Sequence, residues 1–269
     1  MTSPSRSARP VPLVPPQHGA WAFLGLPLVV GIAVAPWTPV LILLAFACIA
    51  AYPWSYFALT VAKEQTSRHP RPERFRTPML VWSVIAIPAL VGLVVARPWL
   101  LWIGIGYALA FAINVAFAMR RDDRDLVNDA VFILECAALV PIAWAVGTLG
   151  RTLTPDATAV PTEVWILTIA VALLLAGSTL HVKSLIRERS HPAFARMSQS
   201  FAIVSLVVSI GLAAWWGLSV GLWLVPAFAF AAGRSFAMRD RTVRPAQIGM
   251  IELVAFVLLA IGAIVLGHG

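Results

Sequence analysis

Five polar residues lie inside or at the ends of long apolar stretches of this sequence, where they could do chemistry. They are Asn114, Glu135, Glu252, His18 and His181. An ionisable side chain within hydrocarbon costs roughly 2.5–3.5 kcal/mol, so each is a functional candidate. Counted in helical rise from the neighbouring charged segments, all five share a similar depth. This predicts one polar cavity that opens toward the cytoplasm, with His18, Glu135 and Glu252 as candidate catalytic, proton-transferring groups.

A compact charged segment, residues 120–125, follows Asn114 in the sequence. One interpretation is that Arg120, Arg121 and Arg124 bind a phosphate while the carboxylates of the segment, Asp125 among them, orient these arginines or hold a cation. The other is a solvated hairpin loop whose charges pair with one another. Asn128 and Asp129 are typical of a helix N-cap. If the preceding helix continued through the segment, one ridge would join four residues: Asn114, Ala118, Arg121 and Asp125.

A second charged segment follows His181 and contains Lys183, Arg187 and Glu188. At helical spacing, His181 and Glu188 share one face, and Lys183 and Arg187 share another. The cations could bind a phosphorylated or lipid-linked anion. They could equally be ordinary cytoplasmic anchors of a membrane protein.

His18 stands in the sequence Gln17-His18-Gly19, where a helix begins. The glycine would let the backbone approach a ligand while the imidazole donates to it. The alternative is a polar group at the membrane interface. The sequence has no H-x-x-x-H or H-E-x-x-H pattern, and we predict no metal site. The two cysteines, Cys48 and Cys136, lie in apolar runs, and we expect them to be packing residues.

The elements that must position these residues follow from composition. Of 269 residues, 60% are hydrophobic and 12% are charged, whereas a soluble domain has about 25% charged residues. This excludes a water-soluble enzyme and predicts an all-α, polytopic transmembrane bundle of about nine spans. Residues 1–17 would be a flexible cytoplasmic tail and 18–269 one transmembrane domain. The expected spans are 20–35, 38–62, 78–96, 98–118, 130–149, 163–182, 198–216, 218–237 and 247–266.

The distribution of cations predicts the orientation of these spans. With the N-terminus inside, 18 of the 20 Lys and Arg residues, Arg234 among them, fall in cytoplasmic segments, and only Arg97 and Arg151 fall outside. The net charge of +8 is therefore a topology signal that also attracts anionic lipid, and no nucleic acid is expected. The C-terminus would be outside. The first span is either retained or cleaved after Ala33-Val34-Ala35, which resembles a signal-peptide site.

Three motifs together resemble the YwiC-like family of bacterial membrane proteins. They are residues 16–21, residues 114–129 with the Arg-rich turn, and residues 183–188. More distantly, the span number and the polar loops after spans two and six resemble the UbiA-type prenyltransferase superfamily. That resemblance implies a prenyl diphosphate held by Mg²⁺ on two Asp-rich motifs. Here the two loops offer only Glu64, Glu73 and Glu188, so Mg²⁺ has weak support and no other cofactor is evident.

The sequence therefore predicts a multi-pass protein of the bacterial cytoplasmic membrane. Its inward-facing site would bind or process an anionic or lipid-like ligand, such as an isoprenoid or another amphipathic anion. The expected ligand-binding residues are Asn114, Arg120, Arg121, Asp125, His181, Lys183, Arg187 and Glu188. A secondary transporter and a non-catalytic membrane assembly factor are the alternatives, and whether the protein is an enzyme stays open.

Overall fold

The computed structural model describes residues 11–123, 125–239, 241 and 243–268, and these residues form helices and no strands. The helices are α1 (His18–Val34), α2 (Pro39–Gln65), α3 (Glu73–Ala96), α4 (Leu100–Arg120), α5 (Leu126–Ala137), α6 (Leu139–Thr148), α7 (Thr162–Ile186), α8 (Pro192–Trp216), α9 (Leu218–Gly221), α10 (Val225–Ala237) and α11 (Pro245–His268), with a short 3₁₀ turn, η1 (Ala157–Ala159).

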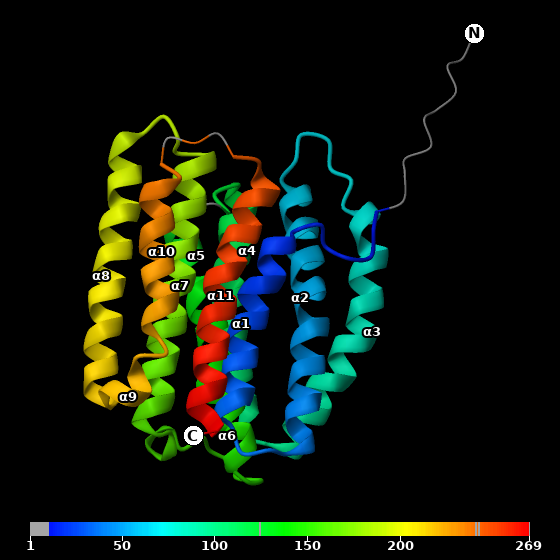
Figure 1. Ribbon diagram of the computed structural model, residues 1–269. Helices are drawn as coiled ribbons and strands as arrows, with labels where there is room; N and C mark the ends of the chain where they lie inside the picture. The colour runs from blue at the N-terminus through cyan, green and yellow to red at the C-terminus, as the bar shows by residue number, and fades with distance from the viewer. Residues whose placement is uncertain (1–10, 124, 240, 242, 269) are drawn as a thin grey trace.

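The helices form one bundle that the described chain crosses nine times (Figure 1). Seven helical segments, with α5 and α6 counted together, are long and apolar enough to span a membrane. The other two passes are α1, of 17 residues, and the interrupted pass of α9 and α10. The predicted polytopic helical bundle is confirmed, and the protein is a multi-pass membrane protein.

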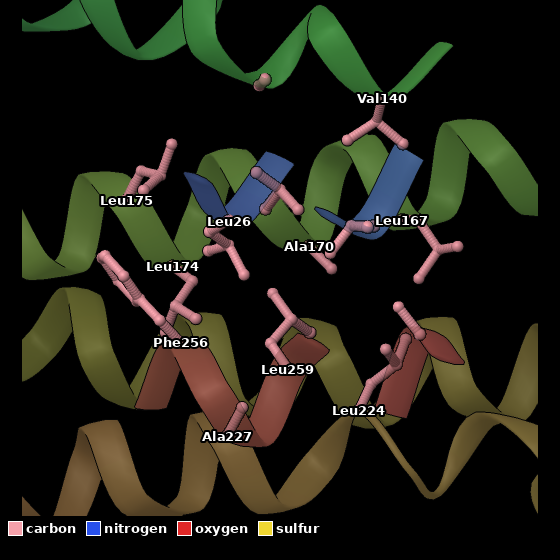
Figure 2. Packing of buried hydrophobic residues seen from close by; sticks show 14 of the residues in the cluster. Leu26, Val140, Leu167, Ala170, Leu174, Leu175, Leu224, Ala227, Phe256 and Leu259 are labelled. Atoms are coloured by element: carbon pink, nitrogen blue, oxygen red, sulfur yellow. The ribbon is translucent and has the colours of Figure 1, made fainter. Parts of the chain in front are cut away.

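α1 lies at the centre of the bundle and packs against α11, α6 and α7. The main core lies between these helices, α5 and α10, and consists of interlocking aliphatic and aromatic side chains such as Leu26, Val140, Leu174 and Leu259 (Figure 2). A second core joins α1 to α2, α3, α4 and α6. The outer faces of α3 and α4 carry exposed apolar residues such as Val84 and Leu109, as expected for surfaces that contact lipid.

Close helix packing at the centre depends on small residues. At Gly31 of α1, a Cβ atom would lie 2.8 Å from the Cβ of Ala143 in α6 and 3.0 Å from the carbonyl oxygen of Leu139. Such contacts leave no room for a side chain. Small residues are how membrane helices approach closely, because van der Waals packing replaces the hydrophobic effect there.

Two of the nine passes are interrupted. α5 ends at Ala137 and α6 begins at Leu139. Pro141 has no N–H to donate to the Ala137 carbonyl, which explains a break at this point. The eighth pass is broken between α9 and α10, just before Pro226. The pass begins after Gly217, which has a φ of 114°. A positive φ of this size is readily adopted only by glycine.

The connections after α2, α4, α7 and α10 lie at the same end of the bundle as the start of α1, which we call the basic end. Arg6, Arg9 and Arg124 lie outside the described residues. The other cations predicted to be cytoplasmic all lie at or near this end, whereas Arg97 and Arg151 lie at the opposite end. The alternation of the nine passes therefore agrees with the division of charge in the sequence.

The fourth helix does not continue to Asp125, which was the condition for the ridge from Asn114 to Asp125. α4 ends at Arg120 in a Schellman motif: Arg121 has a φ of 62°, and the N–H of Asp122 donates to the Phe117 carbonyl at 3.0 Å. The left-handed residue reverses the chain, so the ridge from Asn114 to Asp125 does not form. The predicted N-cap is also displaced, because Asp125 caps α5 and accepts from the N–H of Val127 at 2.7 Å.

At the opposite end, Asp156 caps η1. Its carboxylate accepts from the hydroxyl of Thr158 at 2.6 Å and from the N–H of the same residue at 3.0 Å. These hydrogen bonds stabilise the ionised form, so they lower the pKa of Asp156 below its usual value.

Candidate functional site

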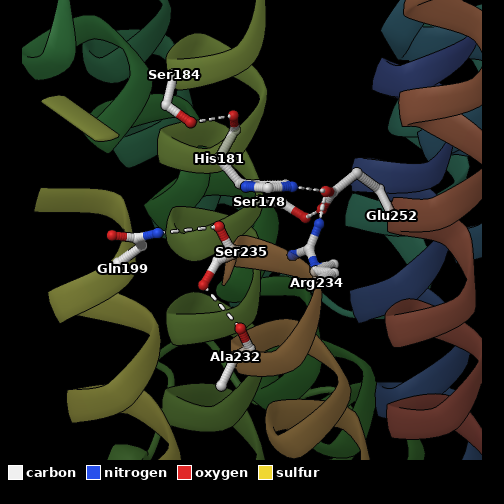
Figure 3. Close-up of polar contacts among 8 residues, drawn as sticks. All are labelled: Ser178, His181, Ser184, Gln199, Ala232, Arg234, Ser235 and Glu252. Atoms are coloured by element: carbon white, nitrogen blue, oxygen red, sulfur yellow. Dashed lines mark hydrogen bonds and ion pairs between the residues drawn. The ribbon is translucent and has the colours of Figure 1, made fainter. Parts of the chain in front are cut away.

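A charged cluster lies buried between α7, α10 and α11 (Figure 3). Arg234 of α10 forms an ion pair with Glu252 of α11, and the hydroxyl of Ser178 in α7 donates to the same carboxylate. The Nε2 atom of His181 lies 3.9 Å from Glu252 Oε1. The side chains of Arg234, Glu252 and His181 are 4%, 7% and 3% exposed, so water does not screen these charges.

Local helical structure places these four residues at one level. Ser178 and His181 are three residues apart in α7 and so share a face. Arg234 lies in the last turn of α10, where the helix dipole favours a cation. Glu252 lies in the second turn of α11. Each is about 5–12 Å from its helix terminus by helical rise, so the cluster lies inside the basic end of the bundle.

A small cavity adjoins the cluster on the side of α8. Its polar wall is formed by His181, Arg234, Ser198, Ser205 and Ser235, and its apolar wall includes Leu174, Ala202 and Phe228. Its volume is about 10 Å³, at the lower limit for one water molecule. Gln199 of α8 closes the region by donating to the Ser235 carbonyl at 3.3 Å.

Several polar atoms around this cavity have no hydrogen-bond partner among the described residues. They are Arg234 Nε and the hydroxyls of Ser198 and Ser205, all buried. A buried polar group without a partner costs about 1–3 kcal/mol, so three of them in one place call for an explanation. Arg234 Nε is a donor, and each hydroxyl can donate. The cavity is therefore suited to an acceptor such as an anion.

The charges of the cluster balance when Arg234 and Glu252 are both ionised and His181 is neutral. Removing one member of a buried ion pair is expensive, because the remaining charge stays in a medium of low dielectric constant. The arrangement can therefore exchange the carboxylate of Glu252 for another anion only if Glu252 takes up a proton. The imidazole beside Glu252 is that of His181, a group that can carry a proton near neutral pH.

A second polar cluster lies between α4 and α5. The amide of Asn114, which is 7% exposed, donates to Glu135 Oε2 at 3.0 Å. The Tyr107 hydroxyl donates to the backbone carbonyl of Glu135 at 2.6 Å. Glu135 lies three residues before the break at Ala138. The two predicted residues Asn114 and Glu135 therefore meet, but in a cluster separate from His181 and Glu252.

Between the two clusters, Lys183 of α7 pairs with Asp129 of α5. Lys183 is two residues from His181 in the chain and therefore points to a different side of α7. At the surface of the basic end, Lys63 and Asp123 form an ion pair of 2.8 Å in which both side chains are about one-third exposed. These pairs tie α7 to α5 and α2 to the connection after α4.

The remaining predicted site residues lie at the surface of the basic end. Arg120, Arg121 and Arg187 are exposed, and Asp125 caps α5. The helical face predicted to join His181 to Glu188 does not form, because α7 ends at Ile186; Glu188 instead pairs with His191 at 2.9 Å. α1 begins at His18, whose side chain lies outside the described part of the structure.

Arg234 and its serine neighbours were not predicted as site residues. From the sequence, Arg234 was expected to be a cytoplasmic anchor, although it lies within the expected span 218–237. Its position inside a span could have marked Arg234 as a functional residue, because an arginine inside a span is rare. The serines could not be predicted from the sequence, because a serine hydroxyl in a helix can donate to a carbonyl of the same helix. Ser235 does so by donating to the Ala232 carbonyl at 2.8 Å.

Within the described ranges, no three His, Cys, Asp or Glu side chains lie close enough together to hold a metal ion. The charged cluster has one carboxylate, one imidazole and a cation. Mg²⁺ prefers several oxygen ligands, whereas this cluster offers one carboxylate and places the positively charged Arg234 beside it. The cluster therefore does not suit Mg²⁺.

Comparison with known proteins finds one matching family. Residues 14–144 match the family described as YwiC-like protein. Over this region, the chain is similar to the YwiC-like family. The resemblance predicted from the sequence motifs is thus confirmed, and the Asn114–Glu135 pair lies within the matched region.

Two relatives are similar over almost their whole lengths. The "Uncharacterized protein YwiC" of Bacillus subtilis (strain 168) is 29% identical over 248 residues, which cover 90% of this chain and 92% of the relative. An "Uncharacterized protein" of Haemophilus influenzae is 26% identical over 266 residues, 94% of this chain and 99% of the relative. No solved structure matches the chain, and the UbiA-type arrangement stays a prediction.

Proposed function

We propose that this YwiC-like protein binds the anionic group of a lipid-like ligand in the cytoplasmic half of the bacterial cytoplasmic membrane, with Arg234 as the main anion-binding group. One observation carries the proposal: the buried Arg234 lines a cavity and keeps Nε without a hydrogen-bond partner among the described residues. The planar guanidinium fits carboxylate and phosphate groups through paired N–H donors.

The rest of the site supports an amphipathic ligand. Ser198 and Ser205 add hydroxyl donors next to Arg234, while Leu174, Ala202 and Phe228 supply apolar contacts. A polar group and a hydrocarbon part could therefore be bound side by side. Isoprenoid and other lipid-linked anions have this character.

Ligand binding would be linked to proton uptake. In the structure, Glu252 provides the negative charge that Arg234 requires. A bound anion would add a second negative charge, which the low dielectric of the site opposes. Protonation of Glu252, with His181 as the neighbouring transfer group, restores the balance. We therefore expect binding to strengthen as the pH falls.

The cavity of about 10 Å³ is too small for a phosphate group, so it would have to open when the ligand binds. The ligand would enter between α8 and its neighbours. α8 contacts α7 and α10 through a row of small residues at helical spacing: Ser198, Ala202, Ser205, Ser209 and Ala213. Its other face carries exposed apolar residues such as Val204 and Val207. Movement of α8 would open the cavity toward the hydrocarbon of the membrane.

Lipid analysis of the purified protein tests this function. The chain is purified from bacterial membranes, and its lipids are extracted and compared with total membrane lipid by mass spectrometry. We expect one anionic amphiphile to be enriched with the wild type and lost from the double variant Arg234→Gln/Glu252→Gln, which keeps the site electrically balanced. The control Arg196→Gln removes an exposed cation of α8 and should retain the lipid.

Two results would refute the proposed function. One is a folded double variant with the same lipid profile as the wild type. The other is a wild-type protein whose lipids match the bulk membrane. Equal loss in the Arg196→Gln control would show that surface charge, rather than the buried site, holds the lipid.

A secondary transporter is the second candidate, and the interrupted fifth pass favours it. Broken helices near coupling residues are common in transporters, and the break at Ala138 follows Glu135 by three residues. This function predicts proton movement in reconstituted vesicles with an internal pH-sensitive dye. The movement should disappear in Glu135→Gln and persist in Glu163→Gln, an exposed carboxylate in the first turn of α7 at the opposite end.

A further inference from the structure

Residues 11–17, which we call the strap, cross the basic end of α2 and α3 before α1 begins (Figure 1). One hydrogen bond holds the strap to α3: the indole N–H of Trp82 donates to the Leu13 carbonyl at 2.7 Å. The strap contains prolines at positions 12, 15 and 16 and bends at residues 13, 14 and 16, so it does not form a helix. The strap therefore rests on the helices and is not part of one.

A groove lies under the strap. It is lined by Val11, Pro12, Val14 and Pro16 of the strap, Tyr56 and Phe57 of α2, and Arg74 and Phe75 of α3. Its volume is about 360 Å³, within the range of small-molecule sites. Seven of these residues are apolar or aromatic and the eighth is a cation, so the groove suits a hydrocarbon chain that carries a negative group.

The position of the groove indicates the source of that ligand. α3 lies at the edge of the bundle (Figure 1) and exposes apolar residues such as Leu80 and Val84. The segment 63–77 has five cations and two glutamates, so it is strongly basic. A lipid of the adjoining leaflet thus meets an apolar groove with positive charge at its rim, and a neutral or cationic partner would gain nothing from that charge.

We propose that this groove is a binding site for an anionic phospholipid, with an acyl chain under the strap and the headgroup phosphate on Arg74. The site is separate from the Arg234 cluster and does not depend on it. The hydrogen bond from Trp82 to the Leu13 carbonyl holds the strap to α3, so it helps to keep the groove in place.

Native mass spectrometry of the full-length protein in detergent tests the proposal. Phosphatidylglycerol and, separately, phosphatidylcholine with the same acyl chains are added, and bound lipid is counted. We expect tight binding of phosphatidylglycerol alone. Arg74→Gln should weaken it by about fivefold, the factor that corresponds to roughly 1 kcal/mol per cation near a lipid surface. Trp82→Phe should also weaken it, since phenylalanine has no N–H to hold the strap.

Arg71→Gln is the matched control, because it removes the same charge three residues earlier, outside the groove lining. Equal loss in Arg71→Gln and Arg74→Gln would overturn the proposal, as would equal binding of the two lipids. Displacement of phosphatidylglycerol by excess inorganic phosphate would also overturn it, because an anion site without an acyl-chain groove would then explain the binding. An Arg74-dependent dimer that excludes the lipid would identify a second copy as the occupant and refute the lipid site.

Discussion

The coupling energy between Arg234 and Glu252 should exceed that of the surface pair Lys63–Asp123, and a double-mutant cycle can measure it. Both side chains are less than one-tenth exposed. In Glu252→Leu the guanidinium keeps its charge but loses its counter-ion, which costs about 3–5 kcal/mol at a buried site. In Arg234→Met/Glu252→Leu no charge remains, and such replacements are often neutral or stabilising.

Thermal unfolding followed with a thiol-reactive fluorogenic dye provides the assay. Cys136 is buried and Cys48 is partly buried, and both are free thiols, so the dye reacts as the bundle opens. At roughly 2 °C per kcal/mol for a chain of this size, Glu252→Leu should lower the Tm by about 6–10 °C. The double variant should regain most of that loss.

The exposed pair of Lys63 and Asp123 serves as the control. Its side chains are 35% and 37% exposed, and a surface pair contributes about 0–1 kcal/mol. Lys63→Gln should therefore shift the Tm by no more than about 2 °C. The reasoning is refuted if Glu252→Leu shifts the Tm as little as Lys63→Gln does, or if the double variant is less stable than Glu252→Leu.

Three further outcomes are expected. Gly31→Leu should destabilise the bundle by about 1–3 kcal/mol, because its Cβ would lie 2.8 Å from that of Ala143; Gly25→Leu, with no atom within 4 Å of its Cβ, is the control in the same Tm assay. Asn114→Ala should lower stability by about 1–2 kcal/mol through loss of the amide bond to Glu135, and an unchanged Tm would contradict this. A fluorescent protein fused to the C-terminus should be dark if that end is outside; bright fluorescence would overturn the orientation.

The number of passes was predictable because each long apolar run must cross the membrane as a helix, whatever it packs against. The expected span 130–149 shows the limit of this reasoning. The structure starts this pass at Leu126 and breaks it at Ala138. Apolar content alone cannot locate a cap or a break, which depend on Asp125 accepting a local hydrogen bond and on the missing N–H of Pro141.

The candidate site was predictable only as a list of polar residues at similar depth. Depth is a one-dimensional quantity, so it grouped Glu135 with Glu252 although they face different helices. The same reasoning left out Arg234, since a cation near a helix end is usually an anchor. The orientation of α10 about its own axis places the Arg234 side chain inside the bundle, against Glu252. No local pattern in the sequence specifies that orientation.

Composition alone indicated a membrane protein of about nine helices, because hydrocarbon tolerates few charges. The charge distribution predicts an orientation, because the loops carry the remaining charges. The order of the helices in space, the separation of the polar residues into two clusters, and the pairing of Arg234 with Glu252 came from packing. Those contacts join residues distant in the chain, and they depend on which faces of α7, α10 and α11 fit together through small and apolar side chains.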